Sequence, residues 1–161
     1  MKKYMVAFML ILVACVTACS DTDVKQSPSD SNYSETYAVS THEELNTLSD
    51  IEISWKTDEL NLTSAVVVLD NTSDKDYYYS YFEIEAEQNG IWYELNCNQE
   101  PISDESLIQA HEITEAAFNI SEYYGTLSDG HYRLILPVAY YNPSKNWDYE
   151  TYYLSCEFTI D

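Results

Sequence analysis

Carboxylates and histidines are the side chains of this sequence that could carry acid–base chemistry. The 161 residues include 28 acids and three histidines, His42, His111 and His131. No nucleophile elbow, HExxH helix, phosphate-binding loop or CxxC pair accompanies them. A hydrolase built on paired carboxylates remains compatible with so many acids, but no motif selects a pair. The sequence therefore predicts no catalytic residue, no cofactor and no metal site.

Two acidic patterns could hold a cation. Oxygen-bearing side chains alternate along residues 70–76, as in calcium-binding loops, but the glycine and the final glutamate of an EF-hand are missing. We interpret this stretch as a polar turn. Glu83, Glu85 and Glu87 form a row that is predicted to be a solvated strand face. A site for a cation or a basic partner is the alternative for this row.

The N-terminus has the pattern of an export signal. Two lysines precede an apolar stretch, residues 4–14, that is too short to span a bilayer. The residues that follow, VTAC at 16–19, resemble the lipobox of bacterial lipoproteins. This resemblance implies a signal peptide at residues 1–18 and a lipid-modified Cys19 that anchors the chain outside the cytoplasm, on the cell membrane. An uncleaved or conventionally cleaved leader with an incidental cysteine is the alternative.

Two cysteines would then remain, Cys97 and Cys156, both on the apolar side of predicted strands. A disulfide between them is permitted outside the cytoplasm. It would close a loop of about sixty residues and stabilise the fold by roughly 4 kcal/mol. Two separate buried thiols are the alternative, because the strands concerned are not neighbours in the usual order of an immunoglobulin-like sandwich.

Residues 19–49 are predicted to be a flexible polar tether. They are rich in Ser, Asp, Thr and Asn, and such a coil would span on the order of 30 Å. Capping boxes that begin at Ser40 and Thr41 make a short helix near Leu45 and Leu48 an open alternative. The formal net charge of −21 disfavours contact with nucleic acid and with anionic membrane surfaces.

Residues 50–161 are predicted to form one all-β domain, since apolar residues recur there with a period of two. The predicted strands span residues 51–55, 63–69, 79–87, 91–97, 112–120, 130–141 and 149–160, with a polar connection at 100–111 and a short turn at 121–125. Asn89-Gly90 predicts a type I′ hairpin turn. Seven strands at this spacing predict an immunoglobulin-like antiparallel β-sandwich with Greek-key topology.

A structural corner is predicted at Leu127, Gly130 and Tyr132. Their spacing fits the tyrosine corner of Greek-key sandwiches, in which a tyrosine at the start of strand F bonds back to the preceding crossover. The strand that follows is predicted to be half-buried. Tyr132 and alternate residues after it would face the core, while Arg133 and Ile135 would face outward.

These patterns together resemble the bacterial Ig-like domain that is common in lipoproteins of Gram-positive bacteria. The matching residues are Leu69, Asn71, Ser73, Asp74, Lys75, Gly90, Trp92, Leu127, Gly130, Tyr132, Arg133, Leu134, Tyr153, Leu154, Glu157, Phe158 and Ile160. The resemblance covers roughly residues 51–161. It implies a surface module and transfers no catalytic residue.

Sixteen tyrosines, many in pairs, leave several rings exposed whichever face of a strand is buried. The predicted recognition face comprises Tyr141, Trp147, Tyr149 and Tyr153, around the loop at 142–148. Ladders of rings that merely cover the sheet are the alternative. The predicted function is a membrane-anchored, non-catalytic binding or structural module with a protein or glycan partner at the cell surface. An extracytoplasmic inhibitor or accessory subunit of an enzyme, and a glycan-binding module, are the alternatives.

Overall fold

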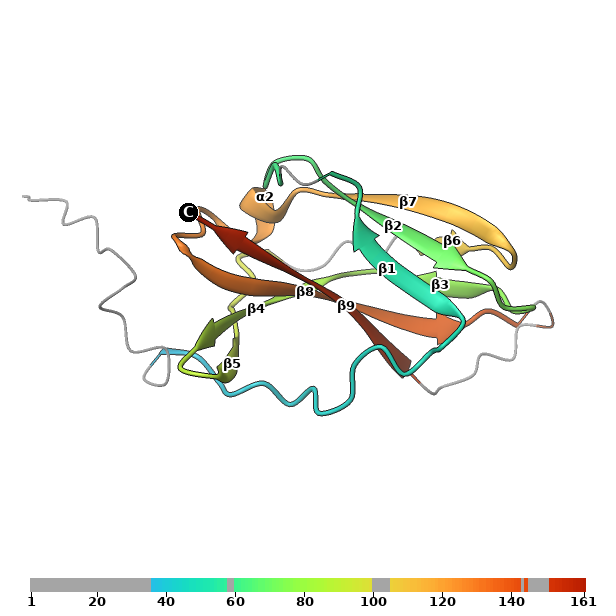
Figure 1. The fold of residues 1–161 in the computed structure, drawn as a ribbon, viewed down its shortest axis with the longest axis horizontal. Helices are drawn as coiled ribbons and strands as arrows, with labels where there is room; N and C mark the ends of the chain where they lie inside the picture. The colour runs from blue at the N-terminus through green and yellow to red at the C-terminus, as the bar shows by residue number, and fades with distance from the viewer. Residues whose placement is uncertain (1–35, 58–59, 100–104, 143, 145–150) are drawn as a thin grey trace, which may run out of the picture.

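The computed structural model describes residues 36–57, 60–99, 105–142, 144 and 151–161. Two antiparallel sheets face each other across the core, and β1, β2 and β7 lie over the sheet that contains β8 and β9 (Figure 1). The elements of this described part are β1 (Ile51–Trp55), β2 (Ala65–Asn71), β3 (Tyr77–Tyr79), β4 (Glu83–Gln88), β5 (Ile91–Glu94), β6 (Ser106–Ile108), β7 (Glu112–Phe118), α2 (Ile120–Tyr124), β8 (Gly130–Tyr140) and β9 (Thr151–Ile160). The predicted all-β sandwich is confirmed.

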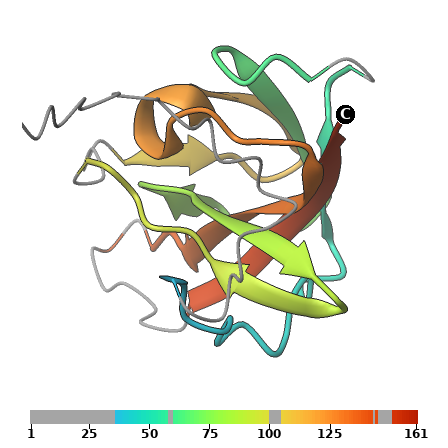
Figure 2. The same cartoon turned by 90° about the vertical axis from the view of Figure 1, so that its left-hand side faces the viewer.

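The longest strand, β8, organises the larger sheet. β9 pairs along one side of β8, while β4 and β3 pair with its first and second halves on the other side. β5 extends the sheet beyond β4, and β6 extends it beyond β3. The smaller sheet has the order β1-β2-β7. The chain crosses between the sheets after β2, β6 and β7, so hairpin neighbours in sequence are not always neighbours in space (Figure 2).

The core lies between the two sheets, where the alternation of each strand places its apolar side chains. Val67 and Leu69 of β2 are fully buried, as are Leu134 and Leu136 of β8. Burial of each such side chain stabilises the fold by about 1.5–3 kcal/mol. At one end of the core, the ring of Phe158 stacks on a β8 tyrosine at 5.5 Å.

That tyrosine, Tyr132, forms the corner that the sequence predicts. Its hydroxyl donates a hydrogen bond to the carbonyl of Ser128 at 2.8 Å. Leu127 is buried beneath the corner. The same geometry favours Gly130, because a Cβ there would stand only 3.2 Å from the Tyr132 ring and hydroxyl.

One predicted strand, 79–87, is in fact two. Tyr78 of β3 pairs with Ala139 of β8, and Glu83 of β4 pairs with Ile135 of β8. Between these two pairs the chain advances by five residues, whereas β8 advances by four. The extra residue is a β-bulge, which interrupts pairing and redirects the side chains beside it. Alternation within the sequence alone does not reveal a register shift of this kind.

Two further boundaries differ from the prediction. β7 ends at Phe118 because Asn119 caps α2, accepting a hydrogen bond from the Glu122 amide at 3.2 Å, and Gly125 ends the helix with a φ of 74°. The polar connection at 100–111 also contains β6. By contrast, the predicted type I′ turn at residues 89–90 has the positive φ angles, 56° and 81°, that this turn requires.

The second half of the predicted tether is not free of the domain. Residues 38–46, which we name the N-terminal strap, lie along the larger sheet. Ser40 and Ala38 exchange backbone hydrogen bonds with the edge strand β5, each 2.9 Å long. The amide of Asn46 donates to the carbonyl of Tyr153 in β9 at 2.8 Å. The short helix left open near Leu45 and Leu48 does not form, since residues 40–50 are not helical and backbone amides of the strap bond to the sheet.

Candidate binding site

The glutamate row of β4 is not the solvated face that alternation predicts. Glu85 is fully buried and makes an ion pair with Arg133 of β8. Both Nε and Nη2 of the arginine contact the same carboxylate oxygen, at 2.6 and 2.5 Å. The other oxygen accepts a hydrogen bond of 2.6 Å from the Ser40 hydroxyl. The outer face of β8 is therefore buried as well, since the strap covers it.

Aromatic rings complete this ionic cluster. The Arg133 guanidinium lies 4.3 Å from the centre of the Trp92 ring. The His42 ring makes a 2.7 Å hydrogen bond with Glu83 and stands 4.4 Å from the Tyr153 ring. Charges paired and covered in this way fix the strap to the sheet. We assign this cluster a structural role, because its charges are paired with one another and bonded to the strap.

The two cysteines of the domain lie apart from each other as free thiols. Cys97 is exposed, after β5, and Cys156 is buried in β9. β4 and β8 separate β5 from β9 in the sheet, so the possible disulfide does not form. Burial raises the pKa of the Cys156 thiol to about 12. Cys19 lies outside the described residues.

The structure describes two of the four residues of the predicted recognition face. Tyr141 is half-buried at the end of β8, and its amide donates to the Asp76 carbonyl at 2.6 Å. Tyr153 is half-buried against His42 under the strap. Trp147 and Tyr149 lie outside the described residues, so a shared face of the four stays a prediction.

The polar turn at 70–76 serves the fold. An Asp76 carboxylate oxygen accepts the Ala110 amide at 2.8 Å, and Asp74 contacts the His111 ring at the same distance. Among the described residues, no three His, Cys, Asp or Glu side chains are grouped so that they could hold a metal ion.

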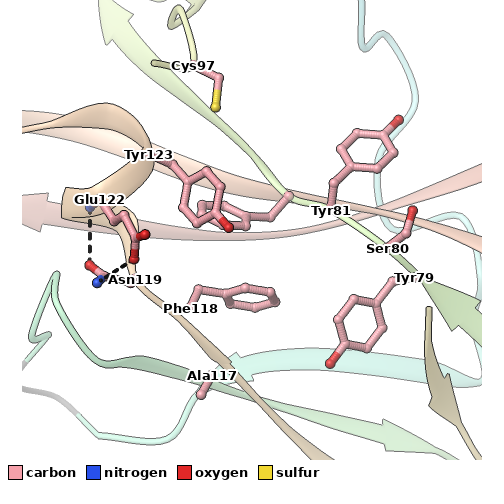
Figure 3. Close-up of a pocket in the computed structure, with 10 residues that line it drawn as sticks. Tyr79, Ser80, Tyr81, Cys97, Ala117, Phe118, Asn119, Glu122 and Tyr123 are labelled. Carbon is pink, nitrogen blue, oxygen red and sulfur yellow. Dashed lines mark hydrogen bonds between the residues drawn. The ribbon is translucent and has the colours of Figure 1, made fainter. Parts of the chain in front are cut away.

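A pocket lined mainly by aromatic rings opens at the edge of the sandwich, beside the β-bulge (Figure 3). Its volume is about 240 Å³. We name it the aromatic pocket, and its lining residues are Tyr79, Ser80, Tyr81, Phe82, Cys97, Ala117, Phe118, Asn119, Glu122 and Tyr123. One wall comes from the bulge, one from the end of β7 and one from α2. Three irregular features of the fold thus meet at one site.

The rings of the aromatic pocket enclose a hollow and do not form a flat platform. Phe82 lies at the centre, 4.8 Å from Phe118 and 5.5 Å from Tyr123. Tyr79 meets Phe118 edge-on at 6.1 Å. The interplanar angles of these three contacts are 44°, 78° and 66°. Figure 3 shows Tyr79 and Tyr81 on one side of the opening, facing Phe118 and Tyr123.

A negative charge stands at this opening. Asn119 holds the Glu122 carboxylate by a 3.0 Å hydrogen bond from its side-chain amide, and the Glu122 side chain remains exposed. Desolvation, together with Glu122, raises the pKa of Tyr123. Desolvation, together with the carboxylate of Glu83, raises the pKa of Tyr81. No Lys, Arg or His is among the lining residues.

The sequence does not predict this pocket, although tyrosines cluster at residues 77–81 and 123–124 on either side of it. The predicted strands at 79–87 and 112–120 run through Phe82 and Phe118 without a break. Continuous strands there would leave no room for a pocket between the two rings. The available signal was Asn119 three residues before Glu122, an N-cap with an acidic partner that marks a helix start. A prediction based on this N-cap ends the strand at Phe118 and starts a helix beside the pocket.

A family model identifies the family of this chain, and the other comparisons carry no argument. No curated protein matches this chain. A crystal structure of a protein from Archaeoglobus fulgidus is 12% identical, with a TM-score of 0.28 over 69% of this chain and 95% of that chain. The ASH/PapD-like domain 7 of human CEP192 is 14% identical, with a TM-score of 0.31 over 73% and 94%. Neither similarity bears on function. Residues 47–159, more than two thirds of the chain, match the model of the bacterial Ig-like domain, and the chain belongs to this family.

Proposed function

We propose that the chain is a surface lipoprotein, anchored through Cys19, whose Ig-like domain is a non-catalytic module that binds another protein. The anchor rests on the VTAC sequence at residues 16–19 and the apolar stretch before it. Bacterial Ig-like domains serve as surface or binding modules, and this supports the general class. In the described part of the chain, no helix is long and apolar enough to cross a membrane.

The observation that carries the binding role is the aromatic pocket. Tyrosine and phenylalanine offer large contact areas at a low entropic cost, and they dominate interaction sites when they are exposed. Here five aromatic side chains border a hollow that opens to solvent. The fold presents it at one edge of the sandwich, where a partner could reach it without displacing a strand.

The surroundings of His42 argue against catalysis at the strap. Its ring bonds to Glu83, while the nearby Ser40 hydroxyl donates to Glu85. The ring therefore activates no nucleophile there, as a hydrolytic triad would require. His111 and His131 each lie beside a carboxylate on the surface.

Crosslinking in cells tests the proposal. The tagged protein is crosslinked, captured and compared with a secreted form in which a conventional cleaved signal replaces residues 1–19. One dominant protein partner, captured with the anchored form and lost after secretion, is the expected result. Equal recovery with both forms would contradict the role of the anchor. No partner with either form, together with retention on a polysaccharide panel, would replace protein binding by glycan binding.

A further inference from the structure

The lining of the aromatic pocket indicates which chemical group it accepts. The faces of aromatic rings carry negative charge density and attract cations. The exposed Glu122 carboxylate stands at the same opening, fixed by Asn119. No basic side chain neutralises either feature within the lining. Rings and carboxylate therefore favour the same kind of occupant, a positively charged one.

Two further observations agree with a positively charged occupant. Desolvation raises the pKa values of Tyr81 and Tyr123, and the carboxylates of Glu83 and Glu122 raise them further. A formal net charge of −21 also draws cations toward the whole molecule. The pocket lies within a field that repels anions.

The size and shape of the pocket decide between kinds of cation. Sites for free small molecules have volumes of about 300–1,000 Å³ and enclose most of the ligand. The aromatic pocket, at about 240 Å³, is smaller and open on one side. Its rings meet at steep angles, which does not suit the flat stacking of a sugar. A single side chain that enters from a second protein fits these dimensions.

We propose that the aromatic pocket accepts a lysine or arginine side chain of a partner protein, held by the ring faces and by the Glu122 carboxylate. This inference rests on the proposed function, and it identifies the group of the partner that is recognised. Cys97 lines the same pocket with an exposed thiol, which provides a reporter of occupancy.

The test uses the full-length protein extracted from membranes in mild detergent. A neutral thiol reagent, methyl methanethiosulfonate, modifies Cys97, and peptide mass analysis follows the rate at that residue. The probes are acetyl-Gly-Lys-Gly-amide, its arginine analogue and its glutamine analogue. We expect saturable protection of Cys97 by one or both basic peptides and none by the glutamine peptide.

Two variants test the assignment of the contacts. Glu122→Gln keeps the bond to Asn119 and should weaken protection by about fivefold, as expected for an exposed ion pair. Glu52→Gln, on the exposed face of β1, removes the same charge elsewhere and should leave protection unchanged. Tyr81→Ala, at an exposed rim position, should also weaken protection. It replaces Glu122→Gln in the test if that variant fails to fold.

Equal protection by the lysine and glutamine peptides, or no protection by any peptide, would overturn the inference. So would equal effects of Glu122→Gln and Glu52→Gln. If a partner is still captured in cells in any of these cases, the proposed binding function stands and only the cation assignment falls. If capture fails as well, both fall.

Discussion

Removal of the Arg133 side-chain charge should destabilise the domain strongly. Arg133→Met leaves the Glu85 carboxylate buried with two remaining partners, the Ser40 hydroxyl at 2.6 Å and the His42 Nε2 at 3.8 Å. The guanidinium contacts with Glu85, at 2.6 and 2.5 Å, are lost together with the stacking on Trp92. Breaking a buried ion pair by removing one partner costs about 3–5 kcal/mol, because the remaining charge stays buried without its ion-pair partner.

The matched control removes both charges. In the double variant Glu85→Met/Arg133→Met neither charge of this pair remains, and apolar replacement of a whole buried pair is often neutral or stabilising. The double variant should therefore be more stable than Arg133→Met alone. Such recovery is the signature of direct coupling between two residues.

Urea unfolding followed by circular dichroism provides the free energies of the wild type, both single variants and the double variant. Values of m must agree among the four proteins, so that differences in midpoint report stability. The reasoning is refuted if Arg133→Met costs less than about 1 kcal/mol, the value typical of an exposed pair. Strict additivity of the two single variants would refute it as well.

Three further predictions concern the corner, the thiols and the strap. Tyr132→Phe should lower the free energy of unfolding by about 1 kcal/mol through loss of one hydrogen bond, and Gly130→Ala should lower it further because the new methyl displaces the ring. At pH 8 iodoacetamide should modify Cys97 and spare Cys156 until urea is added. The pKa of Cys156 is about 12 in the folded protein, against an ordinary value of 9.0. Burial of the protonated thiol therefore stabilises the fold below pH 9, and this stabilisation is lost as the pH rises from 9 to 12. Urea midpoints should fall across that range, and less so in Cys156→Ala. Asn46→Ala removes the 2.8 Å bond from the amide of the β9 serine and places alanine at a φ of 53°, so that amide should exchange faster with deuterium.

The sequence predicts those parts of the fold that local rules determine. Alternation in β2 and β9, the turn at residues 89–90 and the corner at Tyr132 each depend on residues close together in the chain. Their geometry follows from side-chain chemistry at a few positions. For the same reason the general architecture could be predicted before any contact was known.

The features that the sequence does not predict depend on distant segments. Glu85 has the parity of a solvated residue, and it is buried because Ser40 and Arg133 approach it from elsewhere. The bulge after Tyr79 is a property of pairing with β8. The aromatic pocket depends on that bulge and on the end of β7 at Phe118, so periodicity along one strand could not reveal it.

We propose that the partner binds at the aromatic pocket. Benzoylphenylalanine placed at Tyr81, at the rim of the pocket, tests it in living cells by photocrosslinking. The control carries the same photoreactive residue at Ile113, which is more exposed, at 66% against 36%, and lies on the far part of β7. A discrete protein adduct from Tyr81 that is absent from Ile113 is the predicted result. Adducts of equal yield from both positions, or none from Tyr81, would contradict the account.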